Sequence, residues 1–395
     1  MRYPDDNSLD RKLIFLIVLS ALISILTIWC AEPLMSSSLR NSHLWLKQLI
    51  WYLIGTLLIL FINHLNPNRI YICFQFLYWL LMIFLFLLWI DRNIIDLPDT
   101  FIRSINGTTA WLQIPGFGSF QPSEFMKIIL IVLSAHQINN HFQTLTISTT
   151  ITDIHLFLKI LKICFLPILL ILMQPDTGIP IVLIFILIIL LITSPIQKHW
   201  IISLIIAVIL CTGFLLVFYH FWPETFQKIA GYRLRRISGW LNPVETMRNE
   251  GYQLYTSLLL FGSCGLLGCG IKQRIISIPE AHTDFIFTVI AQNFGLCGTL
   301  TVWLICVLLD IRLIRLLIQT PDSKQKKIGT GLAAMMIFQQ LQNMCMVTGL
   351  LPITGIPLPL FSYGGSSILS TMLALSLFFR MSHHQNLLHK GRNKV

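Results

Sequence analysis

The stretch PEAHTDFIF (residues 279–287) places the carboxylate of Asp284 at the start of a long apolar run. A charged group at the edge of a bilayer costs free energy, so such a carboxylate usually has a function. Aspartate is a favoured N-cap, and Asp284 could simply begin a helix. Alternatively, a carboxylate whose pKa is raised in a partly desolvated cavity can act as a general base. We expect the neighbouring His282 to be structural.

Two further acidic positions follow Gly- and Pro-rich or turn-forming stretches. Glu124 and Lys127 end the segment NGTTAWLQIPGFGSFQPSEFMK (106–127), which we interpret as a structured loop leading into a helix. Because they are three residues apart, they can pair on one helical face, or else line a polar cavity. Asp176, in QPDTG (174–178), lies between two apolar segments and is predicted to cap the second one more readily than to take part in chemistry.

Two other polar stretches could contact a ligand. YRLRRI (232–237) contains three arginines. They could bind a phosphate group, because a guanidinium can form two hydrogen bonds with it. Alternatively, they could simply be attracted to anionic lipid headgroups. Residues 252–267 are typical of an amphipathic or re-entrant helix at the membrane surface. TGIPLPLFSYGGSS (354–367) contains two prolines that break a helix. Irregular backbone inside a membrane must be covered by protein or must line a cavity. The stretch therefore predicts a pocket wall or a half-helix.

The elements that position these residues are membrane helices. The chain of 395 residues is 55% hydrophobic, with mean hydropathy +0.74, and only 11% charged, against roughly 25% in soluble proteins. Its apolar runs approach the ~20 residues that cross a bilayer. We therefore predict an all-α polytopic membrane protein, a single integral-membrane domain over 1–395, with about ten transmembrane segments near 13–31, 47–64, 70–90, 123–138, 157–173, 178–195, 200–221, 285–310, 329–350 and 361–381.

The distribution of Lys and Arg sets the expected orientation. Short loops rich in these residues face the cytoplasm, which predicts that both termini are cytoplasmic and that 222–283 is a large extracytoplasmic loop between the seventh and eighth segments. The net charge of +11 then reflects topology rather than nucleic-acid binding, because no basic stripe interleaves with aromatics in a soluble domain. Cys264 and Cys269 share the large loop, but their spacing is weak evidence for a disulfide, and we expect free thiols.

The motifs NGTTAW, QPSEFMK, QPDTG, LNP…GYQ, PEAHTDFIF and TGIPLPLFSYGGSS, in this order from about residue 10 to 382, resemble the SEDS (shape, elongation, division and sporulation) family. The resemblance implies a peptidoglycan glycosyltransferase of the bacterial inner membrane. Such proteins polymerise lipid II, a disaccharide-pentapeptide on undecaprenyl pyrophosphate, and work with a class B penicillin-binding protein. The TGIPLPL loop and the short N-terminus favour the elongation (RodA) branch over the division (FtsW) branch by a small margin.

The resemblance also implies roles for individual residues. Asp284 matches the family's essential aspartate, and substrate contacts are expected from Trp111, Glu124, Lys127, Asp176, Arg233, Arg235, Arg236, Gln253, Ser362 and Ser366. As general base, Asp284 would take the proton of the acceptor 4-hydroxyl while pyrophosphate leaves the donor's anomeric carbon. Positive charge for the pyrophosphate would come from arginines, from Lys127 or from a divalent cation such as Mg²⁺ or Mn²⁺.

Departures from the family pattern and rival functions also follow from the sequence. Gln292 and Asn293 stand where the family often has glutamates, Thr256 lies where a glutamine is usual, and Cys269 replaces a habitual lysine. No acidic pair is evident beside Asp284, which favours direct displacement with inversion over a double displacement.

A flippase of the same lipid precursor would need polar groups reachable from both faces. A non-catalytic scaffold for a penicillin-binding protein would not need Asp284.

Overall fold

The regular elements of the described chain are helices, apart from one short hairpin. A computed structural model describes residues 10–35, 40, 42–95, 98, 100–102, 108–114, 118–144, 148–222, 225, 231–272 and 278–392, without the side chains at 67–68, 212, 215–216, 219–220, 232–235 and 383–392. The long helices are α1 (Arg11–Ala31), α3 (Leu44–His64), α4 (Pro67–Asn93), α5 (Pro122–Thr144), α6 (Thr150–Met173), α7 (Gly178–Ile192), α8 (Lys198–Phe221), α12 (Ile286–Gln319), α13 (Ser323–Val347) and α14 (Gly365–Arg392).

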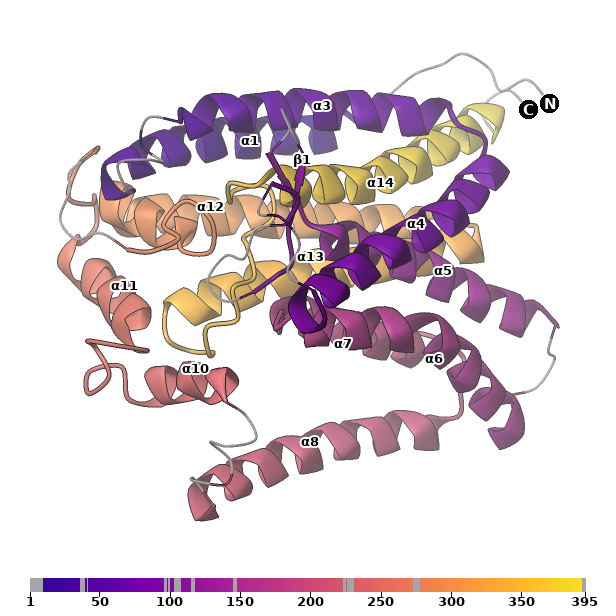
Figure 1. The fold of residues 1–395 in the computed structure, drawn as a ribbon. Coiled ribbons are helices and arrows are strands. Elements are labelled where there is room, and N and C mark those ends of the chain that lie inside the picture. Colours follow the sequence, from indigo (N-terminus) through magenta and orange to yellow (C-terminus); the bar gives the residue numbers. More distant parts are fainter. Residues whose placement is uncertain are drawn as a thin grey trace.

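The remaining elements are short. A 3-10 turn, η1 (Glu32–Leu34), ends α1, and an antiparallel hairpin of β1 (Leu112–Ile114) and β2 (Gly118–Phe120) precedes α5. The large loop holds α10 (Tyr232–Leu241) and α11 (Tyr252–Ser263), which lie at one end of the bundle, whereas α14 runs toward the other end (Figure 1). The surface helix predicted over 252–267 is therefore present but ends four residues earlier.

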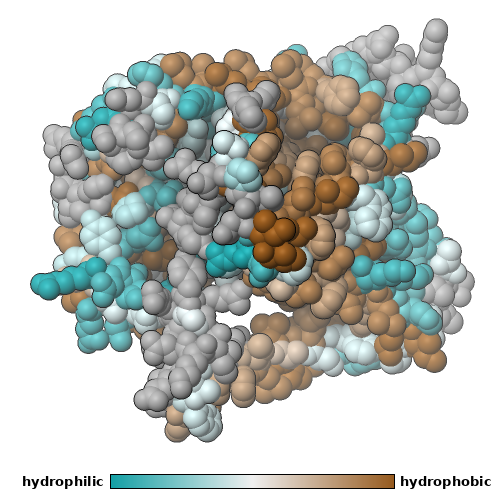
Figure 2. Space-filling model, viewed as in Figure 1, coloured by the Kyte–Doolittle hydropathy of each residue, from teal (hydrophilic) through white to brown (hydrophobic). Residues whose placement is uncertain are grey.

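Each predicted spanning segment overlaps one long helix, so the all-α membrane fold is confirmed. Five helices are long and apolar enough to cross a bilayer, namely α1 (with η1), α3, α4, α6 and α12, and α7 and the first part of α8 are shorter apolar helices. The number of ten spans stays a prediction. Apolar residues dominate the middle of the surface, while hydrophilic residues gather toward the two ends (Figure 2).

Three of the long helices that are less apolar, α5, α13 and α14, lie at the centre of the bundle. The helices α5, α13 and α14 carry long runs of buried residues. They are packed by other helices: α14 against α3, α13 against α7, α12 and α5, and α5 against α4 (Figure 1). Because protein rather than lipid surrounds these three helices, their polar side chains can find partners there.

A kink in α12 receives the end of the large loop. Gly295 adopts a left-handed backbone (φ 63°), and a Cβ there would lie 2.3 Å from the amide nitrogen of Gly268. Loop carbonyls accept hydrogen bonds from the amides of Leu296 and Cys297, at 3.1 Å each. Cys264 and Cys269 are joined by a disulfide, so the expectation of free thiols is wrong. The bond closes the loop that fits into the kink, a pairing in space that sequence spacing does not reveal.

The predicted break before α14 is held by side chains from distant helices. Residues 352–358 have no helical structure, and α14 begins at Gly365. Ser24 donates to the carbonyl of Phe361 at 2.8 Å, and the buried Gln48 donates to that of Ser362 at 3.0 Å. The hydroxyl of Tyr52 donates to the carbonyl of Leu360. Polar groups that a broken helix leaves free are thus satisfied by protein, as a membrane interior requires.

Candidate functional site

Asp284 lies two residues before the start of α12, outside the apolar helix. The N-cap of α12 is Phe285, so the alternative that Asp284 caps this helix is wrong. Its backbone carbonyl accepts a hydrogen bond of 2.8 Å from the side-chain amide of Asn343. The same amide nitrogen also donates to the carbonyl of Ile356 at 2.7 Å. The side chain of Asp284 is half-buried. Its main chain is therefore fixed between α13 and the irregular segment 352–358, while its side chain keeps part of its surface exposed.

Arg236, from α10, reaches the same place as the Asp284 carboxylate. Its Nη1 donates to the carbonyl of Thr354 at 3.1 Å. Gly355 adopts φ +75°, and a Cβ added there would lie 3.3 Å from Oδ2 of Asp284 and 3.9 Å from Nη1 of Arg236. One glycine thus leaves room for a base and a cation on the same side of the irregular segment. Of the three predicted arginines, the side chains of Arg233 and Arg235 lie outside the described residues.

The electrostatic surroundings keep a proton on Asp284 more tightly than in water. The pKa of Asp284 is raised to about 7. Burial contributes most to this rise, Glu280 and Asp176 add to it, and Arg236 opposes it. Two acidic residues, Glu280 and Asp176, thus act electrostatically on Asp284. Glu280 is itself oriented by Thr283, whose hydroxyl donates to its Oε2 at 3.0 Å. A base whose pKa lies near the working pH is suited to proton transfer.

His282 has the structural surroundings that its sequence context suggests. Its carbonyl accepts a hydrogen bond of 2.8 Å from the amide of Tyr363, and the two rings lie 5.6 Å apart. Burial lowers the pKa of His282, which favours the neutral ring. The residue joins the turn before α12 to the segment before α14.

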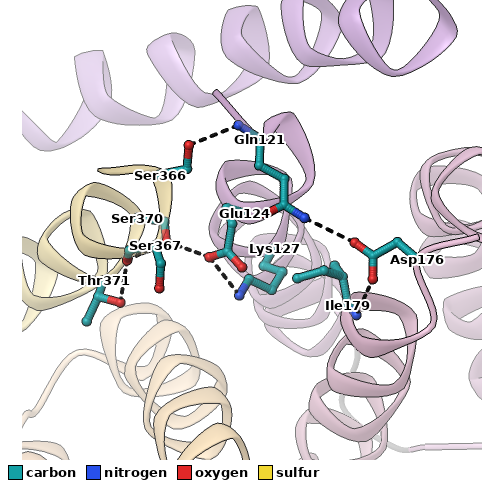
Figure 3. Close-up of polar contacts among 9 residues, drawn as sticks. All are labelled: Gln121, Glu124, Lys127, Asp176, Ile179, Ser366, Ser367, Ser370 and Thr371. Carbon is teal, nitrogen blue, oxygen red and sulfur yellow. Dashed lines mark hydrogen bonds and ion pairs between the residues drawn. The ribbon is translucent and has the colours of Figure 1, made fainter. Parts of the chain in front are cut away.

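A second polar cluster lies at the start of α5 (Figure 3). Lys127 Nζ is 3.0 Å from Oε2 of Glu124, so the predicted pairing is confirmed. Both side chains are buried, with exposed fractions of 1% and 3%. Ser370 of α14 donates to the same Glu124 oxygen at 2.9 Å. In this arrangement the pair contacts protein rather than an open cavity, and it ties α5 to α14.

Asp176 belongs to this second cluster and uses its two oxygens differently (Figure 3). Its Oδ1 accepts hydrogen bonds from the backbone amides of Gly178 and Ile179 at 3.1 and 3.3 Å. Its side chain therefore caps the first amides of α7 as predicted, from the position before the N-cap residue Thr177. Its Oδ2 accepts the side-chain amide of Gln121 at 3.1 Å. Burial raises the pKa of Asp176, and the backbone hydrogen bonds oppose this rise.

The two clusters lie against the same part, 354–356, of the irregular segment 352–358. A Cβ on Gly178 would lie 3.1 Å from the carbonyl oxygen of Thr354 and 3.0 Å from the side chain of Ile356. The same Thr354 carbonyl accepts Arg236. The start of α7, with Asp176, thus packs on one side of 354–356, and Arg236 and Asp284 lie against it from the loop side.

The other predicted substrate residues lie in different settings. Ser362 donates to the carbonyl of Thr283 and accepts the amide of Leu358, each at 2.7 Å, and Ser366 accepts the amide of Gln121 at 2.9 Å. Both hydroxyls therefore hold backbone in place. Trp111 is half-buried just before β1, and Gln253 is half-buried in the first turn of α11. Among the described contacts, neither of them is hydrogen-bonded to a cluster.

Several residues of the site were not anticipated from the sequence. Gln121, Glu280, Asn343 and Ser370 connect or bias the acidic residues described above. Asn343 carried a usable signal, because it is an amide inside an apolar segment. In the part of the chain that the structure describes, no group of three or more His, Cys, Asp or Glu side chains could hold a metal ion.

Comparisons with known proteins place this arrangement in a wider group. A family model described as "Cell cycle protein", for FtsW, RodA and SpoVE, matches residues 10–387. A probable peptidoglycan glycosyltransferase FtsW of Haemophilus influenzae is 30% identical over 403 residues, covering 99% of this chain and 95% of that protein. Stage V sporulation protein E of Bacillus subtilis is 31% identical over 71% of this chain and 72% of its own length.

Solved structures share the fold across nearly the whole chain. A chain from a peptidoglycan synthase complex that coordinates polymerization and crosslinking superposes with a TM-score of 0.73 at 24% identity, covering 96% of this chain and 98% of that one. Rod shape determining protein RodA of Thermus thermophilus superposes with a TM-score of 0.65 at 23% identity, covering 97% and 99% of the two chains. At these identities the likeness concerns the fold.

Proposed function

This chain belongs to the FtsW, RodA and SpoVE family, and we propose that it is a peptidoglycan glycosyltransferase that polymerises lipid II on the outer face of the bacterial inner membrane. The observation that carries the proposal is the position of Asp284. It is a half-buried carboxylate with a raised pKa, placed beside Arg236 at the irregular segment 352–358. The FtsW name of the relatives supports the same reaction.

In the proposed reaction, Asp284 accepts the proton of the acceptor sugar's 4-hydroxyl. That oxygen forms a bond to the donor's anomeric carbon, while the bond from this carbon to the pyrophosphate oxygen breaks. The electron pair leaves with undecaprenyl pyrophosphate, and the configuration inverts. A general base contributes typically about 10²–10⁴-fold to such a rate. Glu280 and Asp176 favour the protonated form of Asp284, which makes it a stronger base once ionised.

Arg236 is the described cation best placed to stabilise the leaving pyrophosphate, because its guanidinium lies against Gly355 beside Asp284. Lys127 is less suited to this role, since it is buried and paired with Glu124. The described carboxylates do not assemble a resident site for Mg²⁺ or Mn²⁺, so we derive no step through a protein-bound cation. Polymerisation assays with and without a chelator would test that part of the proposal.

The proposed orientation has both termini in the cytoplasm and the loop 222–283 outside. The disulfide between Cys264 and Cys269 supports it, because disulfides persist in oxidising compartments and are rare in the cytosol. Asp284, which directly follows this loop, then lies toward the outer side. In intact cells, alkylation before and after reduction should release two thiols from this loop only when a reductant reaches the outer face. Cytoplasmic accessibility of these thiols would contradict the orientation.

We further propose a class B penicillin-binding protein as partner, since a chain of the same fold occurs in a peptidoglycan synthase complex. The elongation branch stays a prediction, because the relatives carry FtsW and sporulation names while a solved structure is a RodA protein. Complementation of elongation-deficient and division-deficient cells by the same full-length gene would separate the two branches.

The test of the function is polymerisation of labelled lipid II by the purified full-length protein, alone and with a penicillin-binding protein. The proposal predicts glycan chains together with one undecaprenyl pyrophosphate per bond formed. A parallel assay in liposomes would follow movement of lipid II between leaflets. Transfer between leaflets without polymer would identify a flippase instead. Polymer that forms only with the partner, and equally well with Asp284→Ala, would identify a scaffold.

A further inference from the structure

A groove between α1 and α12 lies at the end of the bundle away from α10 and α11. It has a volume of about 410 Å³ and is lined by Arg11, Lys12, Phe15, Leu16, Leu308, Ile311, Arg312 and Arg315. Four of these residues are cationic and the other four are apolar. The size lies within the range of roughly 300–1,000 Å³ that is usual for small-molecule sites. The lining thus combines the two chemistries of a phospholipid, a charged headgroup and acyl chains.

The two walls of the groove are held together by Asp10. Its Oδ1 caps α1 by accepting the amides of Lys12 and Leu13 at 3.1 and 3.2 Å. Its Oδ2 accepts Nε of Arg312 from α12 at 2.8 Å. Asp10 is only 6% exposed, so this contact is built into the packing of the two helices. It neutralises one of the four cations and fixes the spacing of the others.

The other three cations have no such partner in the part of the chain that the structure describes. Arg11, Lys12 and Arg315 are exposed, and among the described residues no carboxylate pairs with any of them. A second groove of about 350 Å³ on α6 provides the contrast, because it is lined by Leu158, Leu161, Phe165 and Leu166 with the single cation Lys162. Both grooves have an apolar lining, whereas the concentration of positive charge is found in the groove between α1 and α12 and not in the one on α6.

We propose that this groove binds an anionic glycerophospholipid, with the phosphate at Arg11, Lys12 and Arg315 and the acyl chains along Phe15 and Leu308. Basic pockets between membrane helices are suited to such headgroups. The lipid would brace α1 against α12, the helix that follows Asp284. Binding does not depend on the proposed enzymatic function, and the test below has no catalytic readout.

The test uses the full-length protein in detergent and native mass spectrometry to measure binding of phosphatidylglycerol, cardiolipin and phosphatidylcholine. Arg11→Gln/Arg315→Gln should weaken binding of the two anionic lipids roughly 10- to 30-fold, because each cation near a membrane surface contributes on the order of 1 kcal/mol. The matched control Arg69→Gln/Lys326→Gln removes two exposed cations outside the groove and should change binding less than about twofold.

A charge-conserving variant and a soluble ligand complete the test. Arg11→Lys/Arg315→Lys keeps the charge and should retain most of the affinity, and circular dichroism without added lipid should be the same for all variants. Equal losses in the groove and control variants would overturn the proposal in favour of general surface charge. Soluble glycerol phosphate that binds as tightly as the lipids would also overturn it, because a free phosphate would then suffice.

Discussion

The clusters around Asp284 and Glu124 both have carboxylates near segment 354–356, but of these only the carboxylate of Glu124 is neutralised by a directly paired cation among the described residues. Glu124 is buried and neutralised at 3.0 Å by Lys127. Asp284 is half-buried, and its pKa is raised to about 7 because burial and the neighbouring acids outweigh Arg236. A matched buried pair fixes helices in place, whereas an unmatched carboxylate can exchange a proton near neutral pH. The first cluster is therefore expected to control stability and the second to control rate.

Removing the cation of the buried pair should have the largest effect on stability. Lys127→Met leaves Glu124 buried without its charge partner, which typically costs roughly 3–5 kcal/mol of unfolding free energy. Thermal unfolding in detergent measures it. The double variant Glu124→Gln/Lys127→Met, which removes both charges, should recover much of the loss. If the double variant is no more stable than the single one, the pair does not hold α5 and α14 as described.

Arg236→Gln should mainly lower the rate, by about 100-fold, because one preorganised group that stabilises developing charge is worth about 10²–10³. It should also change the pH profile. Arg236 lowers the pKa of Asp284, so without it the carboxylate stays protonated to higher pH. The acid limb of the rate profile should then move to higher pH than the wild-type limb near 7.

The matched control for Arg236 is Arg248→Gln, which removes an exposed arginine of the same loop. Polymerisation rates measured across pH should be unaffected in this variant. An acid limb that moves to lower pH in Arg236→Gln, or equally in both variants, would contradict the proposed coupling of Arg236 to Asp284.

Gly355→Ala should have a smaller effect, about tenfold on polymerisation, since misplacing reacting groups by a fraction of an ångström is costly. The new Cβ would sit 3.3 Å from Oδ2 of Asp284, at a backbone φ of +75° that alanine rarely adopts. Gly262→Ala in α11 is the control, because a Cβ there meets nothing within 4 Å. Equal polymerisation rates of the two variants would show that the reaction does not depend on the space beside Gly355 that Asp284 and Arg236 border.

Much of the fold could be predicted from the sequence because hydropathy is a local property. Every predicted span overlaps a helix, and the break before α14 was visible in its prolines and glycines. The kink at Gly295 was not, since an isolated glycine in an apolar run has no unique meaning. The disulfide was missed for a related reason, because five residues of spacing do not fix the relative positions of two Cβ atoms.

The candidate site was only partly predictable. Asp284, Arg236 and the Glu124–Lys127 pair could be found from local spacing and residue type. Their partners come from far along the chain: Gln48 contacts Ser362 across 314 residues, and Ser370 reaches Glu124 across 246. The effect of Asp176 on Asp284 likewise depends on how the start of α7 packs against 354–356. Such contacts are set by tertiary packing, which a single sequence does not display.

The central claim is that Asp284 is the base of a glycosyl transfer, and the most direct measurement is the lipid II polymerisation rate of Asp284→Asn. Asp310→Asn makes the same chemical change on α12, far from the site, and is the matched control. We expect a loss of about 10²–10⁴-fold for Asp284→Asn, with lipid II still bound, and a near-normal rate for Asp310→Asn. A normal polymerisation rate in purified, folded Asp284→Asn would contradict the claim.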